Sequence, residues 1–179
     1  MLRNGWVSFA LYLAVSGVSV AAEKKADSYA RIDVHPTCYE VRPDENLVVN
    51  CGFETGTFEG WDQSGDLSNT EVNGDAAHSD NFGAQFSPPT LGFIAQTLST
   101  IPGQNYTISI WFRSLGQPNE FQLYWDGNLI SDQINVGDIV YEQQTWYNNM
   151  ATSELTEIKL GFSNLTGFFY LDDVVVSAF

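Results

Sequence analysis

The clearest structural signal in the sequence is an alternation of side chains between Asn105 and Ser114. Apolar residues stand at every second position: Tyr106, Ile108, Ile110 and Phe112. Between them stand Thr107, Ser109, Trp111 and Arg113. Successive side chains of a β-strand point to opposite faces of a sheet, so this period of two predicts a strand whose first set of residues faces a core.

Comparable signals recur along most of the chain. We predict strands at 47–53, near 70–72, and at 84–86, 93–98, 105–114, 120–125, 128–130, 158–162 and 168–178. The phase of residues 138–151 is ambiguous, and the Asp126-Gly127 pair is typical of a two-residue hairpin turn. Short strands at regular spacing, with no helical period, predict an all-β fold: a two-sheet antiparallel β-sandwich.

Composition limits the classes of partner. Hydrophobic residues make up 44% of the chain, which is too many for a disordered protein and enough for one domain with a core. The formal net charge is -15. Phosphate backbones and anionic membranes should repel such a chain, so we expect no nucleic-acid partner. Neutral glycans, cations and basic proteins remain as possible partners. The alternative is that the acidic residues serve only to keep the protein soluble.

The first 22 residues have the pattern of a signal peptide. One basic residue, Arg3, precedes an apolar run from Trp6 to Val20, which the small residues Ala21 and Ala22 follow. We place cleavage after Ala22, with cleavage after Ala21 as the alternative. A retained N-terminal anchor is the alternative. We therefore predict a secreted or cell-surface protein with no membrane contact after cleavage, made of a signal peptide (1–22), an extended arm (23–44) and a β-sandwich domain (45–179).

The chain contains two cysteines, Cys38 and Cys51. In an oxidising compartment two cysteines of one secreted chain most simply form a disulfide, here joining the arm to the first predicted strand. The alternative is a buried free thiol beside an exposed one.

Motifs at both ends of the chain resemble those of secreted domains related to carbohydrate-binding modules of the 4/9/22 type, which have a galactose-binding-like jelly-roll fold. The opening motif comprises Asn46-Leu47-Val48-Val49-Asn50, Gly52-Phe53-Glu54, Gly56, Phe58 and Gly60-Trp61. Further matches are His78-Ser79, Ala84-Gln85-Phe86, Gln96-Thr97-Leu98, Pro102-Gly103, 106–113, 119–127 and the closing Phe169-Tyr170-Leu171-Asp172-Asp173-Val174. The resemblance spans residues 46–177.

This resemblance implies that the first and last strands lie side by side and share a structural calcium ion. Carried over by motif, the ligands are Glu54 and Asp172, with Asp173 as a further candidate. Carboxylate oxygens suit such a hard cation. Without metal, Glu54 and Asp172 would instead accept hydrogen bonds from backbone amides. The chain departs from the family at Cys51 and at Asp80, where glycine or another small turn residue is usual; Asp80 either adds a ligand or is solvated.

A ligand site is predicted from the period of two. If the alternating apolar residues from Tyr106 to Phe112 face the core, then Trp111 and Arg113 face outward. On the next predicted strand, Gln122 and Tyr124 face outward by the same rule. Should these two strands pair, the four residues form one patch whose aromatic and polar groups suit a neutral sugar. The alternative is that Trp111 and Tyr124 lie beneath a loop as a second small core.

Motifs for catalysis are missing from the sequence. His35 and His78 stand in polar segments, where we expect solvated side chains, and no nucleophile elbow or metalloprotease helix accompanies them. We therefore predict no enzyme, but a secreted, non-catalytic, calcium-stabilised module that binds a neutral glycan or polysaccharide. The alternative is an extracellular structural or adhesion protein that uses the sandwich for protein or self-association.

Overall fold

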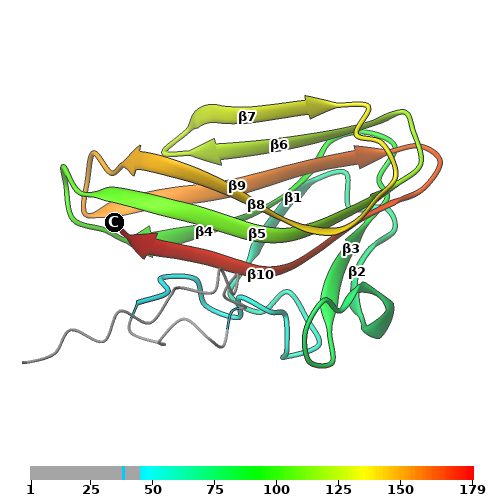
Figure 1. Ribbon diagram of the computed structural model, residues 1–179, viewed down its shortest axis with the longest axis horizontal. Helices are drawn as coiled ribbons and strands as arrows, with labels where there is room; N and C mark the ends of the chain where they lie inside the picture. Colours follow the sequence, from blue (N-terminus) through cyan, green and yellow to red (C-terminus); the bar gives the residue numbers. More distant parts are fainter. Residues whose placement is uncertain (1–37, 39–44) are drawn as a thin grey trace, which may run out of the picture. The chain divides into compact units, whose positions relative to one another are not determined.

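The computed structural model describes Cys38 and residues 45–179, in which the chain forms two five-stranded antiparallel sheets (Figure 1). The β9 sheet has the order β1-β4-β9-β6-β7, and the β10 sheet has the order β2-β3-β10-β5-β8. The strands are β1 (Asp62–Gly65), β2 (Thr70–Asn73), β3 (Gly83–Phe86), β4 (Gly92–Ser99), β5 (Asn105–Leu115), β6 (Asn119–Trp125), β7 (Asn128–Ile134), β8 (Ile139–Met150), β9 (Leu155–Asn164) and β10 (Phe168–Ala178). The predicted two-sheet β-sandwich is confirmed.

The core lies between the two sheets. Tyr106, Ile108, Ile110 and Phe112 of β5 are all buried, as the alternation predicted. The facing residues of the β9 sheet are equally buried: Phe121, Leu123, Ile158, Leu160 and Phe162. The rings of Phe86 and Phe162 stack across the core with their centroids 4.0 Å apart.

The β6–β7 hairpin is also confirmed. Asp126 and Gly127 both have positive φ angles, 52° and 74°, as the two central residues of a type I′ turn require. The structure adds two strands that the sequence pattern did not predict clearly: β1 lies where no strand was predicted, and β8 covers the stretch of ambiguous phase.

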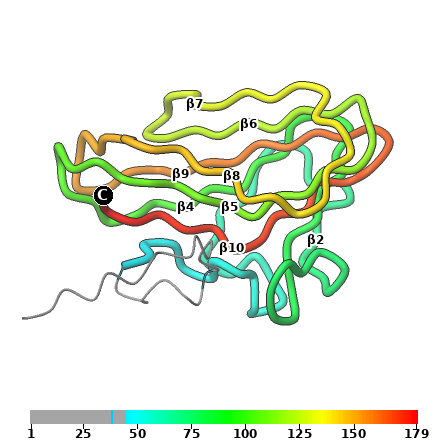
Figure 2. Tube along the Cα trace, viewed as in Figure 1, coloured from blue at the N-terminus to red at the C-terminus, as the bar shows by residue number. Residues whose placement is uncertain are grey.

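The prediction of a strand at 47–53 is wrong. This segment is a series of turns, in which Asn50 and Phe53 have positive φ angles of 50° and 57° that interrupt an extended backbone. It nevertheless runs beside the last strand (Figure 2). Leu47 N donates to Val176 O at 2.9 Å, and Val174 N donates to Cys51 O at 2.9 Å. The expected adjacency of the two ends of the domain therefore holds without a strand.

The expected disulfide is confirmed. Cys38 and Cys51 are joined, with their Cα atoms 6.0 Å apart. The predictions of a signal peptide (1–22) and of an arm (23–44) otherwise lie outside the described residues. Among those that are described, no helix is long and apolar enough to cross a membrane.

Candidate functional site

The predicted four-residue patch is divided between the two sheets. Its premise was that the strands at 105–114 and 120–125 pair, but β5 pairs with β10 and β8, whereas β6 pairs with β7 and β9. The connection from β5 to β6 crosses from one sheet to the other, as Figure 1 shows. Trp111 and Arg113 therefore lie on the outer side of the β10 sheet, and Gln122 and Tyr124 lie on the outer side of the β9 sheet.

The side chains of Trp111 and Arg113 are engaged within the protein. The Trp111 ring stacks on the ring of His78, with centroids 3.8 Å apart and planes inclined by 15°. The Arg113 guanidinium lies 4.9 Å from the centre of the Tyr170 ring. One face of the indole is thus covered, which leaves less of it for stacking on a ligand.

The outer face of the β9 sheet carries aromatic and polar side chains together. Strand register places Gly161 of β9 between Phe93 and Gln122, and Lys159 between Ala95 and Tyr124. The Lys159 ammonium lies 4.6 Å from the centre of the Tyr124 ring and 5.6 Å from that of Phe93. These are cation–π distances, so the cation and the two rings form one unit.

Two further side chains of β6, Gln122 and Glu120, extend this unit from Tyr124 along the strand. The Tyr124 hydroxyl donates to Gln122 Oε1 at 2.6 Å, and Gln122 Nε2 donates to Glu120 Oε1 at 2.6 Å. The three stand at every second position of one strand, so they share a face. We call Phe93, Glu120, Gln122, Tyr124 and Lys159 the β9 face. Sequence reasoning found Gln122 and Tyr124 but missed the other three, since alternation assigns a side to each strand and not the neighbour beside it.

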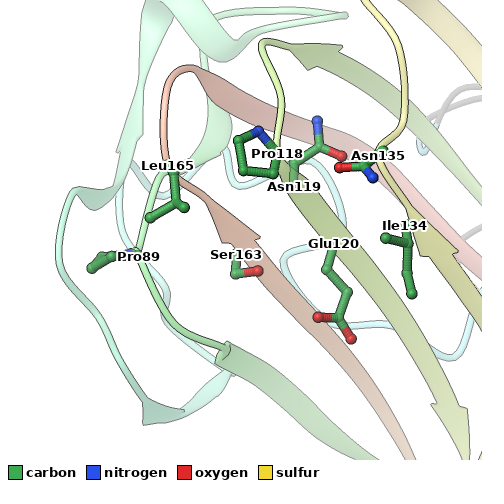
Figure 3. A pocket seen from close by; sticks show the side chains of 8 residues that line it. All are labelled: Pro89, Pro118, Asn119, Glu120, Ile134, Asn135, Ser163 and Leu165. Carbon is green, nitrogen blue, oxygen red and sulfur yellow. The ribbon is translucent and has the colours of Figure 1, made fainter.

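A pocket of about 270 Å³ lies at the Glu120 end of the β9 face. Figure 3 shows its lining: Pro89, Pro118, Asn119, Glu120, Ile134, Asn135, Ser163 and Leu165. Ile134 and Leu165 are 67% and 60% exposed, which makes them an apolar rim around the carboxylate of Glu120 and the hydroxyl of Ser163. Half of the lining residues are apolar and half are polar, so the pocket offers both hydrophobic contact and hydrogen-bonding groups.

On the other sheet, Asp172 and Asp173 occupy a bulge of β10. The register with β5 shifts between Asp172 and Val175, and Asp173 has a φ of +49°. The extra residue lets both Leu171 and Val174 point into the core. The two carboxylates are fully buried and accept hydrogen bonds from the segment at 78–79.

The two carboxylates are held by many donors. Asp172 Oδ2 accepts from the amides of His78 (2.8 Å) and Ser79 (3.0 Å). Asp173 Oδ1 accepts from the Cys38 amide (2.8 Å) and the Ser79 hydroxyl (3.0 Å), and Asp173 Oδ2 lies 2.8 Å from His78 Nδ1. Burial, and then the charge of Asp173, raise the pKa of Asp172 to about 7 against these amide bonds.

His78 is not the solvated loop residue that the sequence suggested. Its side chain is 19% exposed, packs on Trp111, and lies 5.1 Å from the Tyr141 ring between centroids. The contacts come from strands distant in sequence, so no local pattern predicts them. Asp80 is exposed with a φ of +50°, where it takes the turn conformation that glycine usually supplies.

The predicted calcium ligands are only partly brought together. Among the described residues, one group of three or more His, Cys, Asp or Glu side chains has its ligand atoms within 4.8 Å of one another: His78, Asp172 and Asp173. Glu54 is outside it, and its carboxylate accepts from the amides of Asn81 (3.0 Å) and Phe82 (2.8 Å). Among the described residues, the carboxylate of Glu54 does not join those of Asp172 and Asp173 in one group of oxygen ligands. Calcium binding therefore stays a prediction.

Comparison with known proteins relates the chain to others through its fold. No family model matches the chain, and no curated protein does. Solved structures do match. A family 61 carbohydrate-binding module in complex with β-1,4-galactotriose has a TM-score of 0.64 and 20% sequence identity, and the match covers 75% of this chain and 99% of that one.

Two further structures have the same fold. The CBM22-1 xylan-binding domain of Xyn10C from Paenibacillus barcinonensis has a TM-score of 0.56 and 14% identity, covering 75% of this chain and 95% of that one. The K3 adhesin domain of Lys-gingipain from Porphyromonas gingivalis has a TM-score of 0.55 and 17% identity, and the match covers 72% of this chain and 96% of that one. The resemblance to sandwiches of the carbohydrate-binding-module type is confirmed at the level of the fold.

Proposed function

We propose that this protein is a non-catalytic carbohydrate-binding module whose β9 face binds a neutral glycan or polysaccharide. The observation that carries the proposal is the unit of Tyr124, Phe93 and Lys159, joined through Gln122 to Glu120 at the pocket. The similarity in fold to modules described as binding β-1,4-galactotriose and xylan supports it.

The chemistry of the β9 face suits sugar rings. The C–H face of a pyranose packs on an aromatic ring, and the half-buried rings of Tyr124 and Phe93 supply that surface. Glu120 and Lys159 offer a carboxylate and an ammonium to sugar hydroxyl groups, which can both donate and accept, while the buried Gln122 amide holds the Tyr124 hydroxyl and the Glu120 carboxylate in place. The pocket at Glu120 would then accommodate one sugar residue at the end of the bound chain.

Net charge favours a neutral ligand over an acidic one. Residues 45–179 contain two basic side chains, Arg113 and Lys159, against 17 acidic ones. An anionic polysaccharide would meet a repulsive field over most of this surface.

Affinity electrophoresis in gels that contain galactan or xylan tests the proposal. The Tyr124→Ala variant should lose about tenfold in affinity, which corresponds to about 1.4 kcal/mol. A Trp111→Phe variant, which keeps a ring beside His78 on the other sheet, should be retarded like the unaltered protein. Equal retardation of all three proteins by a bound polysaccharide, or detectable hydrolysis of it, would sink this assignment.

Secretion and calcium binding belong to the proposal as predictions of their own. The disulfide suits an oxidising compartment. A mature N-terminus at Glu23 would support export with cleavage after Ala22. A melting temperature that EDTA leaves unchanged would contradict a structural calcium ion.

A second candidate is an adhesion protein that uses the same sandwich to bind protein or itself. The similarity in fold to the K3 adhesin domain favours it. An absence of binding across a glycan array, together with concentration-dependent assembly in sedimentation, would select this candidate over the first.

A further inference from the structure

The Glu120 end of the β9 face is acidic. Glu120 is the one charged residue among those that line the pocket. Strand register places Asp132 of β7 beside Gln122, so its exposed carboxylate lies on the same face of the sheet as Glu120. The pocket and the strand next to it therefore carry two negative charges.

The basic side chains of the sandwich lie elsewhere. Lys159 is paired in register with Tyr124, which is about 13 Å from Glu120 along β6 at about 3.3 Å per residue. That separation exceeds the Debye length of about 8 Å at physiological salt, so Lys159 does little to offset the charge of Glu120. Arg113, the other Lys or Arg of residues 45–179, lies on the β10 sheet. Within the described part of the chain, Glu120 has no cationic partner.

One oxygen of the Glu120 carboxylate is left for a ligand. Its Oε1 atom accepts from Gln122 Nε2 at 2.6 Å, and no group of the described residues donates to its Oε2 atom. Ser163 is the partner of Glu120 on β9, and its hydroxyl points toward the Glu120 side chain in Figure 3. The buried Asn119 side chain is engaged, because it both donates to and accepts from the backbone of Val136. A ligand in the pocket therefore meets a charged acceptor with a hydroxyl beside it.

We propose that the pocket binds a sugar residue that carries a protonated amino group, and that Glu120 accepts a hydrogen bond from this ammonium. A hydrogen bond between charged groups is roughly twice as strong as one between neutral groups, so an amine is favoured here over a hydroxyl or an acetylated amine. The exposed side chains of Ile134 and Leu165 contact the C–H groups of the same ring. This inference rests on the proposed function: neutral rings of the glycan lie on Tyr124, and the amino sugar lies at the Glu120 end.

The charge of the whole sandwich acts in the same direction. Residues 45–179 carry 17 acidic side chains against two basic ones. A glycan with amino groups is attracted to such a surface, and salt weakens this attraction, whereas stacking of a neutral ring on an aromatic side chain carries no such salt dependence. Salt dependence therefore distinguishes recognition of the amine from recognition of the ring.

Calorimetric titration with two chitin-derived oligosaccharides of equal length tests the proposal, one fully N-acetylated and the other partly deacetylated. The unaltered protein should bind the deacetylated one about tenfold more tightly, because only that ligand brings an ammonium to Glu120. Added NaCl should weaken its binding more than that of the acetylated one. The Glu120→Gln variant keeps an oxygen that accepts from Gln122 but loses the charge, so the preference should fall to within about twofold.

The Glu71→Gln variant is the matched control, because it removes the same charge from β2 of the other sheet and should keep the preference. Equal affinity for the two oligosaccharides, no binding of either, or a preference that Glu120→Gln leaves intact would overturn the inference. Retardation by galactan or xylan that depends on Tyr124 would in that case leave the proposed function standing. Failure of both experiments would remove the inference and the proposed function together.

Discussion

Gly161 determines how closely the Phe93 ring can lie against β9. A Cβ atom at this position would stand 2.6 Å from Phe93 Cε1 and 3.4 Å from Gln122 Cβ. The first distance is far below a van der Waals contact, so the ring has to move. Because Phe93 is a half-buried side chain at the surface, it can turn away without disturbing the core.

We therefore expect Gly161→Ala to keep the melting temperature within a few degrees while weakening glycan binding by roughly 3- to 10-fold, a loss of about 1 kcal/mol. Gly137→Ala is the control, since a Cβ there meets only Gln117 Nε2 at 3.8 Å. Isothermal titration with one polysaccharide compares the two variants. Equal affinity in both would show that the Phe93 position does not matter for binding.

At the scale of the strand, β5 shows what the sequence pattern predicts correctly, and the bulge of β10 shows what it misses. The alternation of Tyr106 to Phe112 correctly predicted which side of β5 is buried. The same rule assigned Trp111 and Tyr124 to one patch, because a period of two gives the side of a strand but not the sheet to which the strand belongs. The bulge at Asp173 was equally hidden, since its positive φ depends on partners from distant segments.

The bulge itself leads to a prediction. Asp173→Gly and Asp173→Val both remove the bonds to Cys38, His78 and Ser79, but only valine is strained at a φ of +49°. The valine variant should therefore be less stable than the glycine variant by about 1–2 kcal/mol in urea unfolding. Equal midpoints for the two variants would mean that the backbone at this position relaxes without cost.

At the scale of the whole domain, the disulfide is the cross-link that joins Cys38 to Cys51. It closes a short loop, with a sequence separation of 13, and restricts the unfolded chain. Removal by a Cys38→Ser, Cys51→Ser double substitution should lower the free energy of unfolding by about 3 kcal/mol in the chain-entropy model. Urea unfolding measures this, with the reduced protein as a second comparison. A decrease in the free energy of unfolding of less than about 1 kcal/mol would indicate that residual structure already restricts this loop in the unfolded state.

Division of the aromatic and basic side chains between two sheets is the central feature of the molecule. Lys159 lies over Tyr124 and Phe93 on the β9 sheet, whereas Arg113 lies over Tyr170 on the β10 sheet. The two basic residues thus have similar surroundings on opposite sides of one sandwich, and a pair of alanine substitutions separates the two faces with no difference in net charge.

The most direct test is the affinity of Lys159→Ala and Arg113→Ala for the polysaccharide that the unaltered protein binds best. We expect Lys159→Ala to bind roughly 3- to 10-fold more weakly, because it loses a donor at the β9 face. Arg113→Ala should bind like the unaltered protein. A loss confined to Arg113→Ala would place the ligand on the β10 sheet and contradict the proposed site.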